Sequence, residues 1–177
     1  MHATYLQFIT ATLTHAAEIA RKNFGIVTST VKQEDNNQVL TATDIEIGDY
    51  LVKAVKETFP THNIIDEEAG VIDNQSEFTW VIDPIDGTSN FANGIPTYGV
   101  MIGLLQDDTP VAGGVALPSF DMIYTALKGE GAYRNGERIR VSATAELLSS
   151  LVAYGIDGHQ EEPSITHKET ATLAALV

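Results

Sequence analysis

A short apolar segment that ends in a pair of carboxylates constrains this chain more than any other. Residues 78–82, Phe-Thr-Trp-Val-Ile, are rich in aromatic and β-branched side chains, which predicts a buried strand bounded by turn residues. Asp83-Pro84-Ile85-Asp86-Gly87-Thr88 follows directly. The sequence therefore predicts that Asp83 and Asp86 lie in a tight turn where a strand ends.

This turn combines acidic oxygens with possible anion donors. Gly87 allows the backbone to approach a ligand closely, and Thr88 supplies a hydroxyl and a backbone N–H. Carboxylates that share hard cations beside backbone donors suit metal-assisted phosphoryl chemistry. Asp83 and Asp86 could instead be simple turn formers, but the six-residue string is more specific than a turn requires.

The charge balance argues against one class of partner. Acidic residues outnumber basic ones by 24 to 10, which gives a formal net charge of -14. Nucleic acid is disfavoured, because its phosphates require Lys and Arg. An acidic chain fits a protein that collects cations, and an ordinary solvated acidic surface fits equally well. The length of 177 residues predicts one domain over residues 1–177 with a real core.

Membrane association is not expected. The chain has no cysteine, which excludes disulfides and thiolate zinc sites and fits a reducing compartment. No segment approaches the roughly 20 apolar residues of a membrane helix. The first 24 residues also lack the apolar core of a signal peptide. We therefore predict a cytoplasmic protein without membrane or nucleic-acid partners.

Periodicity and turn residues predict two helices followed mainly by strands. A helix over residues 6–24 should stop at Gly25, and residues 26–40 should form a polar loop. A capping box of Thr43 and Glu46 should begin a second helix that Pro60 closes. Strands are expected at 63–65, 78–82, 98–105, 111–117, 122–127, 138–142 and 151–154, and a last helix over 164–177, with hairpin signals at Asp107-Asp108 and Asn135-Gly136.

Four acidic residues stand at the ends of these expected elements: Asp44, Glu67, Asp83 and Asp86. Taken singly, Asp44 could complement a helix dipole, and Glu67 could be solvent-exposed beside Glu68. A calcium loop of the EF-hand type needs Glu at its twelfth position, which is Gly94 when counted from Asp83. Haloacid-dehalogenase-type phosphatases have one residue between their two aspartates, where this chain has two, and that class stays the weaker alternative.

Several motifs together resemble the inositol monophosphatase family of Mg²⁺-dependent, lithium-sensitive phosphatases. Residues 83–91 match its Asp-Pro-x-Asp-Gly-Thr-x-Asn-Phe signature, and residues 65–68 match its second acidic motif. Residues 41–44 match its Thr-x-x-Asp helix start, and residues 128–136 look like its Lys-Gly-x-Gly-Ala hairpin. The resemblance implies an α/β (α+β) fold, the layered α-β-α-β sandwich of the inositol monophosphatase and fructose bisphosphatase type.

The resemblance also implies which residues bind metal, which activate water and which bind phosphate. The implied metal ligands are Glu67, Asp83, the carbonyl of Ile85, and Asp86, for two or three Mg²⁺ ions that Mn²⁺ could replace and Li⁺ would inhibit. Asp44 and Thr88 would orient the attacking water and help to deprotonate it. The N–H groups of Gly87 and Thr88 would hold phosphate oxygens. Lys32 could correspond to a family lysine near the metals.

Two departures from the family pattern stand out. Asp66 occupies the position of the usual glycine before the acidic pair, which adds a charge beside a metal ligand. The family's later Trp-Asp motif is missing, since Trp80 is the only tryptophan and precedes Asp83. That motif supplies a further aspartate to the second metal. We therefore expect this chain to be the N-terminal portion of a longer enzyme.

The functional expectation is Mg²⁺-dependent hydrolysis of a phosphate monoester by metal-activated water. The resemblance favours inositol monophosphate or a similar sugar or polyol phosphate as the small phosphorylated substrate. The non-enzymatic alternative is a truncated, catalytically impaired remnant that binds cations. Exposed apolar surface on the hairpin strands favours association, and a homodimer is the expected form.

Overall fold

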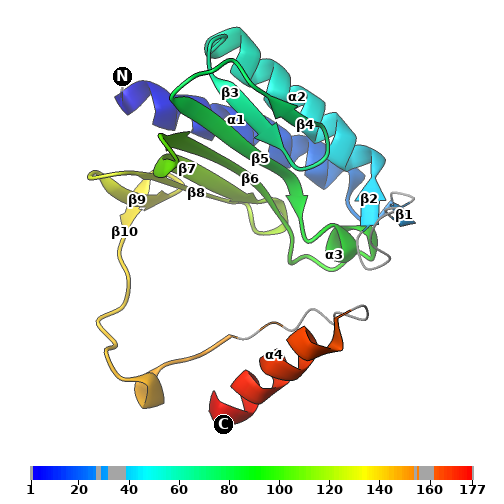
Figure 1. Ribbon diagram of the computed structural model, residues 1–177, viewed down its shortest axis with the longest axis vertical. Coiled ribbons are helices and arrows are strands. Elements are labelled where there is room, and N and C mark those ends of the chain that lie inside the picture. Colours follow the sequence, from blue (N-terminus) through cyan, green and yellow to red (C-terminus); the bar gives the residue numbers. More distant parts are fainter. Residues whose placement is uncertain (1, 27–28, 32–38, 154, 156–161, 177) are drawn as a thin grey trace. The chain divides into compact units, whose positions relative to one another are not determined.

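The computed structural model describes residues 2–26, 29–31, 39–153, 155 and 162–176 (Figure 1). The chain divides into two compact units, Met1–Arg140 and Val141–Val177. The first unit carries the sheet and the predicted site residues, and the second carries η2 (Leu147–Ser149) and α4 (Pro163–Leu176). The single domain expected over residues 1–177 stays a prediction.

One eight-stranded sheet organises the first unit, in the order β10-β9-β8-β7-β6-β5-β3-β4. Its strands are β3 (Asn63–Asp66), β4 (Gly70–Ile72), β5 (Phe78–Asp86), β6 (Gly99–Gln106), β7 (Thr109–Leu117), β8 (Met122–Leu127), β9 (Gly131–Arg134) and β10 (Glu137–Ile139). The β3–β5 pair is parallel, whereas the other neighbours are antiparallel. Short turns explain this pattern, because antiparallel strands can be joined by hairpins while the parallel pair needs a longer connection.

Two helices pack side by side on one face of this sheet (Figure 1). They are α1 (His2–Asn23), which contacts β6, β7 and β8, and α2 (Ala42–Thr58), which contacts β3 and β5. Gly114 in β7 sets the spacing, since a Cβ there would lie 2.5 Å from Ile9 and 2.7 Å from Leu13. The lack of a side chain at Gly114 therefore lets α1 pack closely on β7.

The start of α2 differs from the expected one. β1 (Ser29–Val31) and β2 (Val39–Thr41) form an antiparallel pair, so the described part of residues 26–40 is not entirely loop. Thr41 is extended and caps α2, with Asp44 as the reciprocal partner of a capping box. The expected Thr43–Glu46 box was wrong, because the helix begins earlier and Thr43 already lies within its first turn.

β5 continues through the motif that was expected to form a turn. Pro84, Ile85 and Asp86 remain in the strand, and the pairing with β6 shifts register between Asp83 and Asp86. Proline has no N–H to donate, so such an irregularity is where a sheet accepts it. The chain reverses only at Gly87, and α3 (Thr88–Ala92) follows.

Other boundaries were also corrected. β4 and β9 were not expected, β10 ends at Ile139, and residues 151–153 form no strand, while Tyr154 lies outside the described residues. The last helix, α4, agrees with the expected 164–177 helix to within a residue at each end. None of the helices in the described ranges is both long and apolar enough to cross a membrane.

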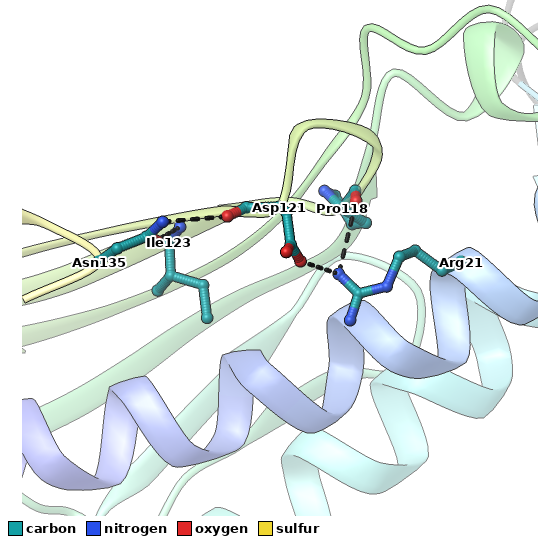
Figure 2. Close-up of polar contacts among 5 residues, drawn as sticks. All are labelled: Arg21, Pro118, Asp121, Ile123 and Asn135. Carbon is teal, nitrogen blue, oxygen red and sulfur yellow. Dashed lines mark hydrogen bonds and ion pairs between the residues drawn. The ribbon is translucent and has the colours of Figure 1, made fainter.

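A polar cluster joins the end of α1 to the β7–β8 connection and to the turn between β9 and β10 (Figure 2). Arg21 donates to Asp121 Oδ1 at 3.1 Å and to the carbonyl of Pro118 at 3.5 Å. Asn135 donates to the carbonyl of Asp121 at 3.0 Å and accepts from the N–H of Ile123 at 2.7 Å. Side chains from α1 and from the turn between β9 and β10 therefore fix the β7–β8 connection.

Candidate functional site

The predicted carboxylates gather where β3 and β5 end. Because side chains alternate along a strand, Trp80 and Ile82 point into the helical layer and Asp83 points to the other face, where it is half-buried. The N–H of Glu67 donates to the carbonyl of Ile82 at 3.2 Å. This parallel neighbour places the Glu67 side chain close enough to Asp83 for the two carboxyl groups to interact.

Burial and neighbouring negative charges raise the pKa of the Asp83 carboxyl group. Burial, then the charges of Glu67 and Asp86, the Glu67 hydrogen bond and the charge of Asp44 together raise the pKa of Asp83 from 3.8 to about 7. A carboxyl group with a pKa raised in this way is one whose charged form lacks compensation. Glu67, Asp83, Asp86 and Asp44 are therefore close enough to interact, as the sequence motifs suggested.

The donor set fits a hard divalent cation. Asp83 Oδ1 is buried and has no hydrogen-bond partner within the described residues, so a cation would satisfy an oxygen that the protein leaves open. Carboxylate and carbonyl oxygens are the ligands that Mg²⁺ prefers. In the described part of the chain, no three acidic or histidine side chains are already grouped as a preformed metal site.

Asp44 is held rigidly beside this cluster. It is only 1 % exposed, and its Oδ2 accepts from the N–H of Thr41 at 2.9 Å and from the Thr41 hydroxyl. Its Oδ1 lies 3.1 Å from the Thr88 hydroxyl, which also lies 2.8 Å from the carbonyl of Ile85. One hydroxyl proton can serve only one acceptor at a time. The Thr88 hydroxyl therefore stands between two residues of the predicted site.

Gly87 is required by the fold itself. Its φ of +81° lies in the left-handed region, and a Cβ there would approach the carbonyl of Thr97 to 3.2 Å. The close approach expected of Gly87 is thus to the protein's own backbone in this structure. Thr88 follows as the first residue of the five-residue helix α3.

Sequence reasoning missed one polar residue of the site and left two others undecided. Thr41 was quoted only as part of a motif, although its Thr-x-x-Asp spacing to Asp44 is itself a capping signal. Asp66 is 3 % exposed and points toward α2, the face opposite to Asp83. Lys32 lies outside the described residues.

The sheet, the two helices on one of its faces and the acidic cluster define an α/β sandwich that solved phosphatases share. An IMPase from Thermotoga maritima matches with a TM-score of 0.75 and 31% sequence identity, over 80% of this chain and 55% of that chain. A sequence model of the inositol monophosphatase family matches residues 2–177. The chain belongs to the inositol monophosphatase family, and the expected layered fold is confirmed.

Named relatives agree with this membership. A "Fructose-1,6-bisphosphatase/inositol-1-monophosphatase" of Aquifex aeolicus is 34% identical over 152 residues, which cover 85% of this chain and 58% of the relative. "Inositol monophosphatase 1" of Solanum lycopersicum is 40% identical over 141 residues, which cover 77% of this chain and 51% of the relative. The chain therefore spans little more than half the length of these relatives.

Proposed function

We propose that this chain carries the metal-binding half of a phosphatase that hydrolyses phosphate monoesters through metal-activated water. One observation carries the proposal: a half-buried carboxylate, Asp83, has an open oxygen and a pKa raised by its acidic neighbours. Beside it lies the hydrogen-bonded pair Asp44 and Thr88. Family membership supports the same reaction class.

Each predicted residue has a role in this proposal. Glu67, Asp83, Asp86 and the carbonyl of Ile85 would hold Mg²⁺, which supplies hydroxide near neutral pH and neutralises the transferring phosphoryl group when bound. Asp44 accepts a proton through Thr88, whose hydroxyl orients the attacking water. The backbone N–H groups of Gly87 and Thr88 would bind phosphate oxygens.

The substrate class is proposed from the relatives' names. The Aquifex aeolicus relative is named for a fructose bisphosphatase and an inositol monophosphatase, which supports a sugar or polyol phosphate here. Since the chain spans about half of such relatives, we also propose that it turns over poorly alone. A cation-binding remnant without turnover is the second candidate that this length supports.

The cytoplasmic location and the homodimer are proposals as well. Composition supports the first, since a chain without cysteine fits a reducing compartment. The second is supported by a mostly apolar hollow on the sheet, lined by residues that include Val81, Met101 and Ala126. Apolar surface of this kind favours association.

The direct test is phosphate release from inositol 1-phosphate at millimolar Mg²⁺, with the chain alone and with a C-terminally extended version. We expect slow or no turnover by the chain and faster turnover by the extended version, both abolished by Asp83→Asn. Hydrolysis in ¹⁸O-water should place one labelled oxygen in the phosphate in a single turnover. An aspartyl-phosphate trapped on Asp83 would contradict the proposal and support a haloacid-dehalogenase-type reaction.

A further inference from the structure

Asp66 is a buried carboxylate that directly precedes Glu67 of the acidic cluster in the sequence. Its side chain points toward α2, whereas Asp83 points to the opposite face of the sheet. It occupies the last position of β3, on the same face as the buried Ile64. The backbone of α2 comes close at Gly48, where an added Cβ would lie 3.2 Å from Asp66 Oδ2 and 3.3 Å from Pro84 Cγ. The Asp66 side chain is therefore held between α2 and β5.

The other oxygen of Asp66 organises the turn that follows. Asp66 Oδ1 accepts from the N–H of Glu68 at 2.9 Å and from the N–H of Ala69 at 2.6 Å. An aspartate that accepts from the backbone two and three residues later fixes a turn. Glu67 lies inside this turn, and its own N–H is bound to the carbonyl of Ile82. The backbone on both sides of Glu67 is thus held in place.

Burying the Asp66 carboxylate does not by itself stabilise the fold. Asp66 Oδ2 has no hydrogen-bond partner within the described residues, and an unsatisfied buried polar oxygen costs free energy. What the side chain supplies in return is the pair of turn hydrogen bonds. These two hydrogen bonds fix the backbone of the turn that contains Glu67, whose side chain lies near Asp83.

We propose that Asp66 is a positioning residue, which holds Glu67 in register with Asp83 by fixing the turn and anchoring it against α2. This inference rests on the proposed function, because Glu67 matters in this way only if it binds metal. Groups that orient metal ligands commonly change metal affinity by about 10–100-fold when they are removed. Asp66 acts through Glu67 and does not itself bind the ion.

The test is Mn²⁺ binding to the 177-residue chain, measured by titration calorimetry. Asp66→Ala removes both turn hydrogen bonds and should weaken Mn²⁺ binding about tenfold. Asp66→Asn keeps the Oδ1 acceptor and should rescue most of the affinity. Asp73→Ala is the matched control, since the exposed Asp73 also accepts from a backbone N–H two residues later, that of Gln75 at 2.8 Å, and it should change nothing.

A double-mutant cycle separates positioning from general loss of structure. In a Glu67→Gln background, Asp66→Ala should cause no further loss of Mn²⁺ affinity, because the ligand through which it acts is already gone. An equal loss in both backgrounds would overturn the positioning role. If Asp66→Ala does not fold, Asp66→Ser enters the same cycle with the same expected coupling.

The remaining outcomes distinguish a failure of the Asp66 role from a failure of the metal site. Wild-type binding that Asp66→Ala leaves unchanged would overturn the role of Asp66 and leave the metal site standing. An absence of Mn²⁺ binding by the wild-type chain would overturn the metal site itself and the positioning role with it.

Discussion

The two ends of β5 bury opposite kinds of side chain. At its start, Phe78 and Trp80 pack among the rings of Tyr5, Phe8, Phe59 and His62. There the polar atoms are paired, since Trp80 Nε1 donates to His62 Nδ1 at 3.1 Å. At its end, Asp83 keeps a buried oxygen without a partner among the described residues. The start of β5, here called the aromatic end, therefore stabilises the fold through packed rings and paired polar atoms. The other end, around Asp83 and here called the acidic end, has an oxygen that could bind a cation.

Removing the aromatic end should have the largest effect on stability. Trp80 is 0% exposed, and Trp80→Ala should lower the free energy of unfolding by about 3–5 kcal/mol. Urea unfolding followed by circular dichroism measures the change. The half-exposed Phe120 provides the control, and Phe120→Ala should shift stability by less than about 0.5 kcal/mol. Similar losses for both variants would show that the aromatic cluster is not the stabilising end.

Thr88→Ala should impair turnover rather than folding. The Thr88 hydroxyl bridges Asp44 and Ile85, and acid–base assistance of this kind contributes at least about a hundredfold to kcat. Steady-state kinetics of the C-terminally extended enzyme should show this loss with Mn²⁺ affinity nearly unchanged. Ser89→Ala, the exposed neighbour, should keep kcat. Activity within a factor of a few for Thr88→Ala would make the Asp44–Thr88 pair structural.

The acidic end should respond to metal and to pH. At ten times its Kd, Mg²⁺ should stabilise the wild-type chain by about 1.4 kcal/mol, and Asp83→Asn should abolish this shift. Without metal, the folded chain binds more protons than the unfolded chain between pH 3.8 and about 7, because the pKa of Asp83 is raised. The stability that protonated Asp83 contributes is therefore complete below this window and lost as the pH rises through it.

Melting temperatures across pH, with and without Mg²⁺, measure both effects. Asp49→Asn, at an exposed position of α2, should keep the wild-type profile. A wild-type melting temperature indifferent to millimolar Mg²⁺ would argue against an unsatisfied acidic end.

The smallest expected effect is a pH dependence of stability at the aromatic end, caused by His62 and opposite in sign to that of Asp83. Burial lowers the pKa of His62 below 6.5, although the charge of Glu77 partly opposes the shift. The unfolded chain then binds the proton more readily, so this contribution is complete above pH 6.5 and is lost as the pH falls toward the folded pKa. His62→Gln should flatten the acid side of the metal-free stability profile, while His167→Gln at an exposed position should leave it as it is. An unchanged profile for His62→Gln would place the acid response elsewhere.

The sequence predicted those parts of the fold that local patterns determine. The turn between β9 and β10 followed from Asn135-Gly136, whose φ values of +49° and +81° suit such residues, although β9 itself was not expected. The helices followed from apolar spacing, as at Leu13, Leu51 and Val55, which are buried. The carboxylate cluster was also foreseen, since Asp44, Glu67 and Asp86 all act on Asp83.

Long-range contacts explain what could not be predicted. β4 is three residues long and forms against β3, so its own residues carry too little pattern. The direction of Asp66 depends on how closely α2 approaches at Gly48, which no local sequence feature reports. The extension of β5 through Asp86 depends on its partner Gly99 in β6.

The polar cluster of Figure 2 has a consequence for the order in which the chain can complete its fold. Arg21 and Asp121 are 100 positions apart, and Asn135 follows another 14 positions later. At a synthesis rate of about 5–20 residues per second, Arg21 would wait about 5–20 s for its carboxylate partner. During that time two of the strands on which α1 packs are also missing, since β7 ends at Leu117 and β8 begins at Met122. The ion pair and the docking of α1 on these two strands therefore become possible at nearly the same point of synthesis.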